Sequence, residues 1–207
     1  MLKDTGERVI PEKMKITNDL LLEHVARYHF AINYSSGRVL DFASGSGYGS
    51  HIIAKKCKDK GVTEVIGVDN DKDAIAYGQY KYYHPLTTFL HGDVTASDLP
   101  EKLGQFDTIL SFETIEHIPD EKQFLSNIYA MLKPGGTLLL STPFGKGRGV
   151  PCGSPFHVHQ LTIGEFKQLF VDYRSSAFYL QKGVLITPET LRDEEDYYPL
   201  GIAVCEK

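Results

Sequence analysis

The chain has 207 residues, 42% of them hydrophobic and 24% charged, values typical of a soluble globular protein with a single domain-sized core. Its net charge of −5 argues against a broad polyanion-binding surface, so nucleic acid is not an expected partner. The N-terminus has no signal-peptide core, and no apolar run reaches the ~18 residues that a membrane span requires.

Apolar periodicity predicts five strands that alternate with helices along the first two thirds of the chain. The first helix is expected over residues 18–34, where apolar side chains recur at steps of three and four. The strands are expected at 38–42, 64–69, 87–91, 106–112 and 137–142. The intervening helices are expected at 51–56, from Asp71 onward, at 97–102 and at 121–132, with a turn at 133–136. Near-continuous apolar strands in this alternation predict a parallel sheet that is buried on both faces.

The C-terminal part of the chain has a different pattern. A helix is expected near 162–170, followed by strand-like segments at 176–181 and 201–205. The long connection between them has no helical pattern, which predicts a hairpin closing the sheet edge. The three cysteines, Cys57, Cys152 and Cys205, have no metal-type spacing and are expected to be reduced thiols in a cytoplasmic protein.

The most informative segment is the glycine-rich loop after the first strand. Asp41 ends that strand, and Gly45, Gly47 and Gly49 follow before the next helix. Such a loop lets a ligand approach the backbone closely, and the helix behind it offers unpaired N–H groups. The dinucleotide fingerprint needs a glycine where Ser50 stands, and the carboxylate of Asp41 suits a cationic ligand better than a diphosphate.

The pattern Asp41-x-Ala43-x-Gly45-x-Gly47 resembles motif I of class I S-adenosylmethionine-dependent methyltransferases, with Ala43 in place of the usual first glycine. The resemblance covers residues 37–145 by motifs and the rest by element order. It implies an α/β fold with a doubly wound, mostly parallel seven-stranded sheet and an antiparallel last strand. It also implies S-adenosylmethionine as cofactor, held at its methionine part by Asp41 and by the loop residues Ala43, Ser44, Gly45, Ser46 and Gly47.

Further cofactor contacts are expected where the parallel strands end, because ligands of such sheets bind beyond the carboxyl ends of the strands. Asp69, with Asn70 beside it, is placed to accept hydrogen bonds from both ribose hydroxyls. Asp93 is expected to accept from the adenine amino group, with Val94 against the ring. Phe112 is expected near the methionine portion.

The acceptor side is predicted from the run that follows the fourth strand. On a helical turn Glu113, Glu116 and His117 would share one face, under a later loop that carries His157 and His159. Such a set suits a divalent metal, with Glu113, Glu116, His117 and His157 as the expected ligands. The run resembles ubiquinone-pathway O-methyltransferases and small-RNA 3′-end 2′-O-methyltransferases, in which a bound metal positions hydroxyl oxygens. Alternatively Glu113 faces the cofactor and His117 acts as a general base, while His157 and His159 are ordinary loop residues.

Residues 1–36 are expected to form an N-terminal lid packed on a methyltransferase domain of residues 37–207. The segment from Thr5 to Pro11 loosely resembles the lid of a methyltransferase subgroup associated with glycans and small metabolites. Arg8, Arg27 and Tyr28 are therefore candidates to cover the cofactor or contact an acceptor, or else they are surface residues of a lid helix.

The sequence thus favours an enzyme that methylates a hydroxyl of a small molecule or glycan, with Glu113, His117 and His157 as catalytic residues. Metal-assisted 2′-O-methylation of an RNA end, a nicotinamide-dependent oxidoreductase and a non-catalytic cofactor-binding module are the alternatives. The pattern leaves open the acceptor, the use of a metal, the choice between His157 and His159, and the oligomeric state.

Overall fold

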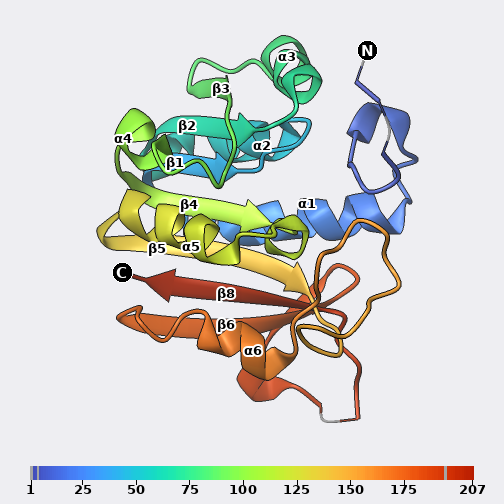
Figure 1. Ribbon diagram of the computed structural model, residues 1–207. Coiled ribbons are helices and arrows are strands. Elements are labelled where there is room, and N and C mark those ends of the chain that lie inside the picture. Colours follow the sequence, from blue (N-terminus) through green and yellow to red (C-terminus); the bar gives the residue numbers. More distant parts are fainter. Residues whose placement is uncertain (1, 4, 194) are drawn as a thin grey trace.

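The fold is a single twisted sheet with helices on both faces (Figure 1). The computed structural model describes residues 2–3, 5–193 and 195–207. The sheet has eight strands in the order β3-β2-β1-β4-β5-β8-β6-β7. This arrangement confirms the expected α/β fold with a doubly wound, mostly parallel sheet.

The parallel part of the sheet consists of the five strands predicted from the sequence. Their bounds are β1 Gly37–Phe42, β2 Val62–Asp69, β3 Thr87–His91, β4 Phe106–Phe112 and β5 Leu132–Pro143. The central strands are buried almost throughout because helices cover both of their faces. The expected turn at 133–136 lies inside β5, where the pairing with β4 shifts register between Phe106 and Thr108.

The helices form two layers, each with its own apolar cluster against the sheet. One layer contains α1 Asp19–Ala31, α2 Tyr48–Cys57 and α3 Lys72–Lys81, and the other contains α4 Leu99–Leu103, α5 Glu121–Met131 and α6 Ile163–Gln168. Polar side chains begin these helices: Asn18 caps α1, Asp71 caps α3, and Thr162 forms a capping box with Glu165 in α6. Short 3-10 helices are η1 Pro11–Lys13, η2 Lys58–Lys60, η3 Ile115–His117 and η4 Glu189–Leu191.

The C-terminal strands differ from the prediction in one respect. β6 Ser175–Lys182 and β8 Leu200–Glu206 pair antiparallel as expected, and β8 also pairs antiparallel with β5. The connection between them holds an additional strand, β7 Leu185–Pro188, and the short helix η4. Gly183, with φ of 60°, lies in the tight turn that folds β7 back onto β6. The sheet therefore has eight strands, where the sequence predicted seven.

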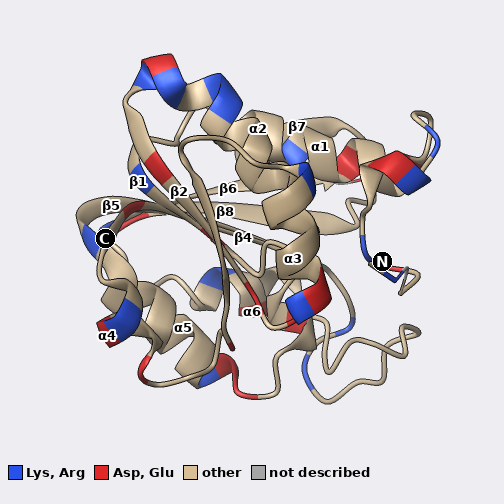
Figure 2. Ribbon diagram, turned by 90° about the horizontal axis from the view of Figure 1, so that it is seen from above, with Lys and Arg blue, Asp and Glu red and all other residues tan. Residues whose placement is uncertain are grey.

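This topology gathers the carboxyl ends of the five parallel strands at one edge of the sheet (Figure 1). The N-terminal segment and the loop after β5 both pass beside that edge. Lys and Arg alternate with Asp and Glu along the outer helices and loops (Figure 2). Among the described helices, none is both long and apolar enough to cross a membrane.

Candidate active site

A cavity of about 450 Å³ lies at this edge of the sheet. Its walls come from the N-terminal segment, α1, the glycine-rich loop, the ends of β2 and β4, and the loop after β5. We call the part around Gly45, Asp69, Asn70 and Val94 the cofactor half, and the part around His117, Ile118 and Phe156 the acceptor half. The sequence-predicted cofactor residues that line the cavity are Ala43, Ser44, Gly45, Ser46, Asp69, Asn70, Val94 and Phe112.

The glycine-rich loop keeps its shape through positive φ angles and one carboxylate. Gly45 (φ 55°) and Gly47 (φ 89°) occupy the left-handed region, and a Cβ on Gly47 would meet the Phe89 ring at 2.6 Å. Ala43 occupies the same region with φ of 70°, a conformation that suits the glycine usual at this position. Gly47 does not line the cavity; it begins α2 and packs against β3.

Asp69 holds this loop and remains available to a ligand. Its Oδ2 accepts from the Gly45 N–H at 2.8 Å, and its Oδ1 accepts from the Asp71 N–H at 3.0 Å. Burial raises the pKa of Asp69. Each carboxylate oxygen has a further acceptor position, so a vicinal diol can be bound at this point.

Asp41 is placed differently from the expectation that it helps to hold the cofactor. Its side chain is buried and does not line the cavity. Its carboxylate accepts from the Tyr28 hydroxyl at 3.0 Å and from the Ser50 hydroxyl at 2.6 Å. Burial raises the pKa of Asp41 to about 6. Asp41 therefore ties α1 and α2 together behind the loop, and any effect on a ligand passes through Tyr28, which does line the cavity.

Asp93 is also outside the cavity wall, although its neighbour Val94 is in it. Its Oδ1 accepts from both the N–H and the hydroxyl of Thr95, which lowers the pKa of Asp93. This local turn holds the carboxylate against its own backbone. The contact of Asp93 with adenine remains a prediction.

The expected helical face of Glu113, Glu116 and His117 does not form. The helix after β4 is the single turn η3, and Glu113 precedes it at the end of the strand with φ of 48°. Its Oε1 accepts from the Arg27 guanidinium and lies 3.2 Å from His24 Nε2, both on α1. Glu113 lines the cavity, but it is turned toward α1, so it does not join the histidines as a metal ligand.

Glu116 lies beneath the acceptor half and is 1% exposed. Its Oε2 accepts from the Thr142 hydroxyl at 3.1 Å, whereas its buried Oε1 has no hydrogen-bond partner among the described residues. That oxygen is 4.0 Å from His117 Nε2. Burial raises the pKa of Glu116 to about 8.

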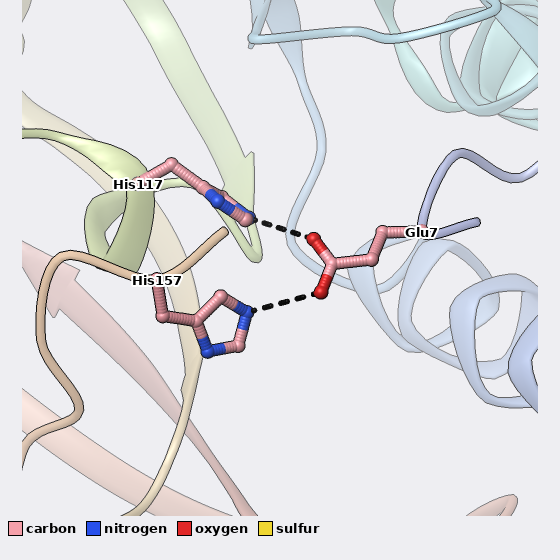
Figure 3. Close-up of side chains that lie close together, drawn as sticks. All are labelled: Glu7, His117 and His157. Atoms are coloured by element: carbon pink, nitrogen blue, oxygen red, sulfur yellow. Dashed lines mark ion pairs between the residues drawn. The ribbon is translucent and has the colours of Figure 1, made fainter. Parts of the chain in front are cut away.

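The rings of His117 and His157 make an edge-to-face contact, and the carboxylate of Glu7 lies beside both of them (Figure 3). Their ring centroids are 4.9 Å apart. The Glu7 oxygens lie 4.0 Å from His117 Nε2 and 3.6 Å from His157 Nε2. His117 Nδ1 is 3.1 Å from the carbonyl oxygen of Phe156, which can only accept. The proton of neutral His117 is therefore on Nδ1, and the Nε2 lone pair faces Glu7 and Glu116.

His159 lies apart from this group. Its Nε2 is 3.2 Å from Glu121 Oε2, at the start of α5, and its side chain does not line the cavity. The ring of His157 packs against His117, with centroids 4.9 Å apart, whereas the ring of His159 lies beside Glu121. Of the two candidate loop histidines, His157 is the one that the fold brings to the acceptor half.

The residues of the N-terminal region have distinct places. Arg27 is 0% exposed and bridges Glu113 and Gln181 Oε1, the latter at 2.9 Å, so it is not a surface residue of a lid helix. Arg8 lines the cofactor half and pairs with Asp71 at 2.7 Å. Residues of α1 join the same apolar cluster as β1 and β4. The division of the chain at residue 36 stays a prediction.

Sequence reasoning did not identify Glu7 or His24 as site residues. Both line the cavity, and Glu7 belongs to the Thr-Gly-Glu-Arg segment in which only Arg8 was singled out. The segment's charge and glycine content mark it as unusual, but only the tertiary fold places Glu7 beside His117, 110 residues later in the chain.

Comparisons with known proteins agree with this geometry. A family described as a methyltransferase domain matches residues 39–136. A probable S-adenosylmethionine-dependent methyltransferase of Mycolicibacterium smegmatis is 34% identical over 80% of this chain and 62% of its own length. A ubiquinone biosynthesis O-methyltransferase of Pseudomonas fluorescens is 30% identical over 54% of this chain and 46% of its own length. The chain thus spans less than two thirds of either relative.

The fold itself recurs in a solved S-adenosylmethionine-dependent methyltransferase from Archaeoglobus fulgidus. The two share 17% sequence identity with a TM-score of 0.65, over 92% of this chain and 95% of that one. Together with the glycine-rich loop and the sheet order, these findings lead to one assignment. They support a class I S-adenosylmethionine-dependent methyltransferase.

Proposed function

We propose that the chain transfers a methyl group from S-adenosylmethionine to a hydroxyl oxygen of a small molecule or glycan. The observation that carries the proposal is the tautomer of His117, whose Nδ1 is committed to the Phe156 carbonyl and whose Nε2 lone pair is directed at the acceptor half. A hydroxyl nucleophile must lose its proton as it attacks the methyl carbon, and a neutral imidazole is suited to accept it. The rest of the catalysis is alignment of nucleophile, methyl and sulfur.

In this proposal the cofactor half binds S-adenosylmethionine through Asp69 at the ribose and through the loop of Ala43 to Ser46 at the methionine part. Phe112 and Glu113 stand where the methionine part meets the acceptor half. The acceptor binds between His117, Ile118 and Phe156. The sequence similarity to a protein named ubiquinone biosynthesis O-methyltransferase supports a small-molecule acceptor. The cytoplasm remains the proposed location, consistent with three free cysteines.

A divalent metal is part of the proposal because the donor set fits one. One ligand atom each from Glu7, His117 and His157 lie within 4.8 Å of one another, and the unpartnered Oε1 of Glu116 adjoins them. Glu7, Glu116, His117 and His157 would hold the ion, so Glu7 replaces Glu113 in the expected set. When bound, the metal would act as a Lewis acid on the acceptor hydroxyl and lower its pKa. The two roles of His117 Nε2 exclude each other: with the metal bound there, the acceptor hydroxyl would lose its proton to water, and without the metal His117 is the general base.

The proposal is tested by incubating the protein with radiolabelled S-adenosylmethionine and fractionated metabolite, glycan and RNA pools. We expect label in a hydroxyl-bearing small molecule or glycan, and loss of labelling in His117→Ala with unchanged affinity for S-adenosylhomocysteine. Transfer of the label to RNA would contradict a small-molecule or glycan acceptor and would identify RNA as the acceptor instead. Calorimetric binding of NAD in preference to S-adenosylhomocysteine would support the oxidoreductase alternative, which the family assignment already disfavours. Cofactor binding without transfer to any pool would favour the non-catalytic module.

A further inference from the structure

The N-terminal residues 5–9, which we call the strap, cross the cavity from one half to the other. Thr5, Glu7, Arg8 and Val9 all line it. At one end the strap is anchored to the cofactor half: the Val9 carbonyl accepts from the Ser46 hydroxyl at 2.8 Å, and Ile10 is buried against Ala74 of α3. The strap therefore rests on the glycine-rich loop on which the cofactor also depends.

Two consecutive side chains of the strap reach opposite halves of the cavity. Arg8 Nη1 is 2.7 Å from Asp71 Oδ2, two residues beyond the ribose-binding Asp69. Glu7 instead accepts from the Ser154 hydroxyl at 3.0 Å and lies beside both His117 and His157. Because Glu7 and Arg8 are consecutive residues, the position of one short backbone segment sets where both side chains lie.

Cofactor binding and strap position are consequently linked. Arg8 lies beside Asp69, where the ribose is expected, and the strap forms part of the wall around that position. We propose that the strap opens to admit S-adenosylmethionine, that the Arg8–Asp71 ion pair latches it over the bound cofactor, and that the latched strap delivers Glu7 to the acceptor half. Arg8 is thus a positioning residue, and the cofactor binds before the acceptor. The role of Glu7 in the acceptor half rests on the proposed function. The latch formed by Arg8 and Asp71 requires only that the chain binds the cofactor.

The latch is tested by the dissociation rate of radiolabelled S-adenosylhomocysteine in Arg8→Ala and in Asp71→Asn. Asparagine keeps the helix cap that Asp71 provides to α3, so this variant removes the charge alone. We expect dissociation to accelerate roughly fivefold in each variant, and no further in the double variant, because both break the same ion pair. The matched control is Arg174→Ala, which breaks a 2.8 Å ion pair with Glu206 at the opposite edge of the sheet.

A second measurement follows the strap directly. Glutamyl endopeptidase cleaves after glutamate, and cleavage after Glu7 requires an open strap. S-adenosylhomocysteine should slow this cleavage in the unmodified chain and much less in Asp71→Asn, which leaves the cleaved sequence intact. Dissociation no faster than in Arg174→Ala, additive effects in the double variant, or equal protection in both proteins would each overturn the latch. Absence of S-adenosylhomocysteine binding to the unmodified chain would instead overturn the proposed function.

Discussion

At the scale of single residues, the three strand-end aspartates occupy three different environments. Asp41 is buried beneath Tyr28, Asp69 opens into the cavity, and Asp93 is engaged with Thr95. Sequence position alone gave them similar roles, because each follows a parallel strand. Their local partners differ. The hydroxyl of Tyr28 on α1 covers Asp41, whereas two backbone N–H groups hold Asp69 and leave a free acceptor position on each of its oxygens.

We predict that Asp69→Ala weakens binding of S-adenosylhomocysteine by about 1.5–3 kcal/mol, as expected for lost hydrogen bonds to a charged group. Isothermal titration calorimetry gives the affinity. Asp98→Ala is the matched control, since it removes an exposed carboxylate that pairs with Lys102 and does not line the cavity. Equal affinity of Asp69→Ala and the unmodified chain, with the variant folded, would show that the ribose is held elsewhere.

Asp41 makes stability depend on pH in the direction opposite to most carboxylates. Burial raises its pKa in the folded chain to about 6 from 3.8, so between these values the folded state binds more protons than the unfolded state. The contribution of Asp41 to the free energy of unfolding is therefore full below pH 3.8 and lost as the pH rises through 6. The difference amounts to roughly 3 kcal/mol.

Asp41→Asn should remove this dependence, because the amide does not ionise. We expect the free energy of unfolding of the variant, relative to that of the unmodified chain, to increase as the pH rises from 4 to 7, because only the unmodified chain loses the Asp41 contribution. Urea denaturation at a series of pH values measures it. A constant difference across that range would mean that Asp41 ionises in the folded chain as readily as in the unfolded one.

At the scale of elements, the backbone conformation of the glycine-rich loop leaves space for a ligand beside it. Gly45 has φ of 55° and a Cβ there would meet no protein atom within 4 Å, so the space beside it belongs to the cavity. We predict that Gly45→Val abolishes cofactor binding, because the side chain fills that space. Gly61→Val is the matched control: Gly61 has φ of 89° and equally open surroundings, but it lies in the turn before β2.

The comparison of these two variants separates strain from steric exclusion. Both place a β-branched residue in the left-handed region, so both should lose stability by a similar amount in thermal or urea unfolding. Only Gly45→Val should lose S-adenosylhomocysteine binding. If both variants bind it with unchanged affinity, the loop does not line the cofactor site.

The strands and helices of the parallel half were predictable from sequence because each carries its own signal. β3 and β4 have the predicted bounds, since each is an apolar run between turn residues. The sequence pattern does not reveal β7, because residues 185–188 form a short strand that has no buried residue and ends in proline, features of an edge strand that resemble a loop. The glycine-loop and Asp69 predictions likewise rested on contiguous motifs, and Asp69 and loop residues 43–46 line the cavity, whereas Gly47 does not.

The acceptor half was less predictable because its geometry depends on distant partners. Helical spacing suggested that Glu113 would join His117, but Arg27 and His24 of α1 hold it, and no local pattern reveals that contact. Glu7 was overlooked for the same reason, since its neighbours in space are His117 and His157. Contacts between remote segments are a property of the whole fold.

At the scale of the whole molecule, the metal hypothesis depends on assembly of ligands from three remote segments. Glu7 comes from the strap, His117 and Glu116 from η3, and His157 from the loop after β5. The backbone carbonyl of Phe156 fixes the tautomer of His117, and the backbone N–H of Val158 donates to the Glu116 carbonyl at 2.7 Å, so the loop and η3 form one unit. Among the four proposed ligands, Glu7 is the one that comes from outside this unit.

We therefore predict that the folded chain binds one divalent ion, magnesium, manganese or zinc, and that activity falls on treatment with chelator and returns with the ion. Binding is measured by calorimetry on chelated protein. Glu7→Gln and His117→Ala should each weaken ion binding at least tenfold, a loss in the range of single partners around metal sites, whereas Glu113→Gln should leave ion affinity unchanged because its carboxylate is turned to α1. Ion affinity lost in Glu113→Gln but kept in Glu7→Gln would restore the ligand set expected from sequence. Activity indifferent to chelator but lost in His117→Ala would leave His117 as a metal-free general base.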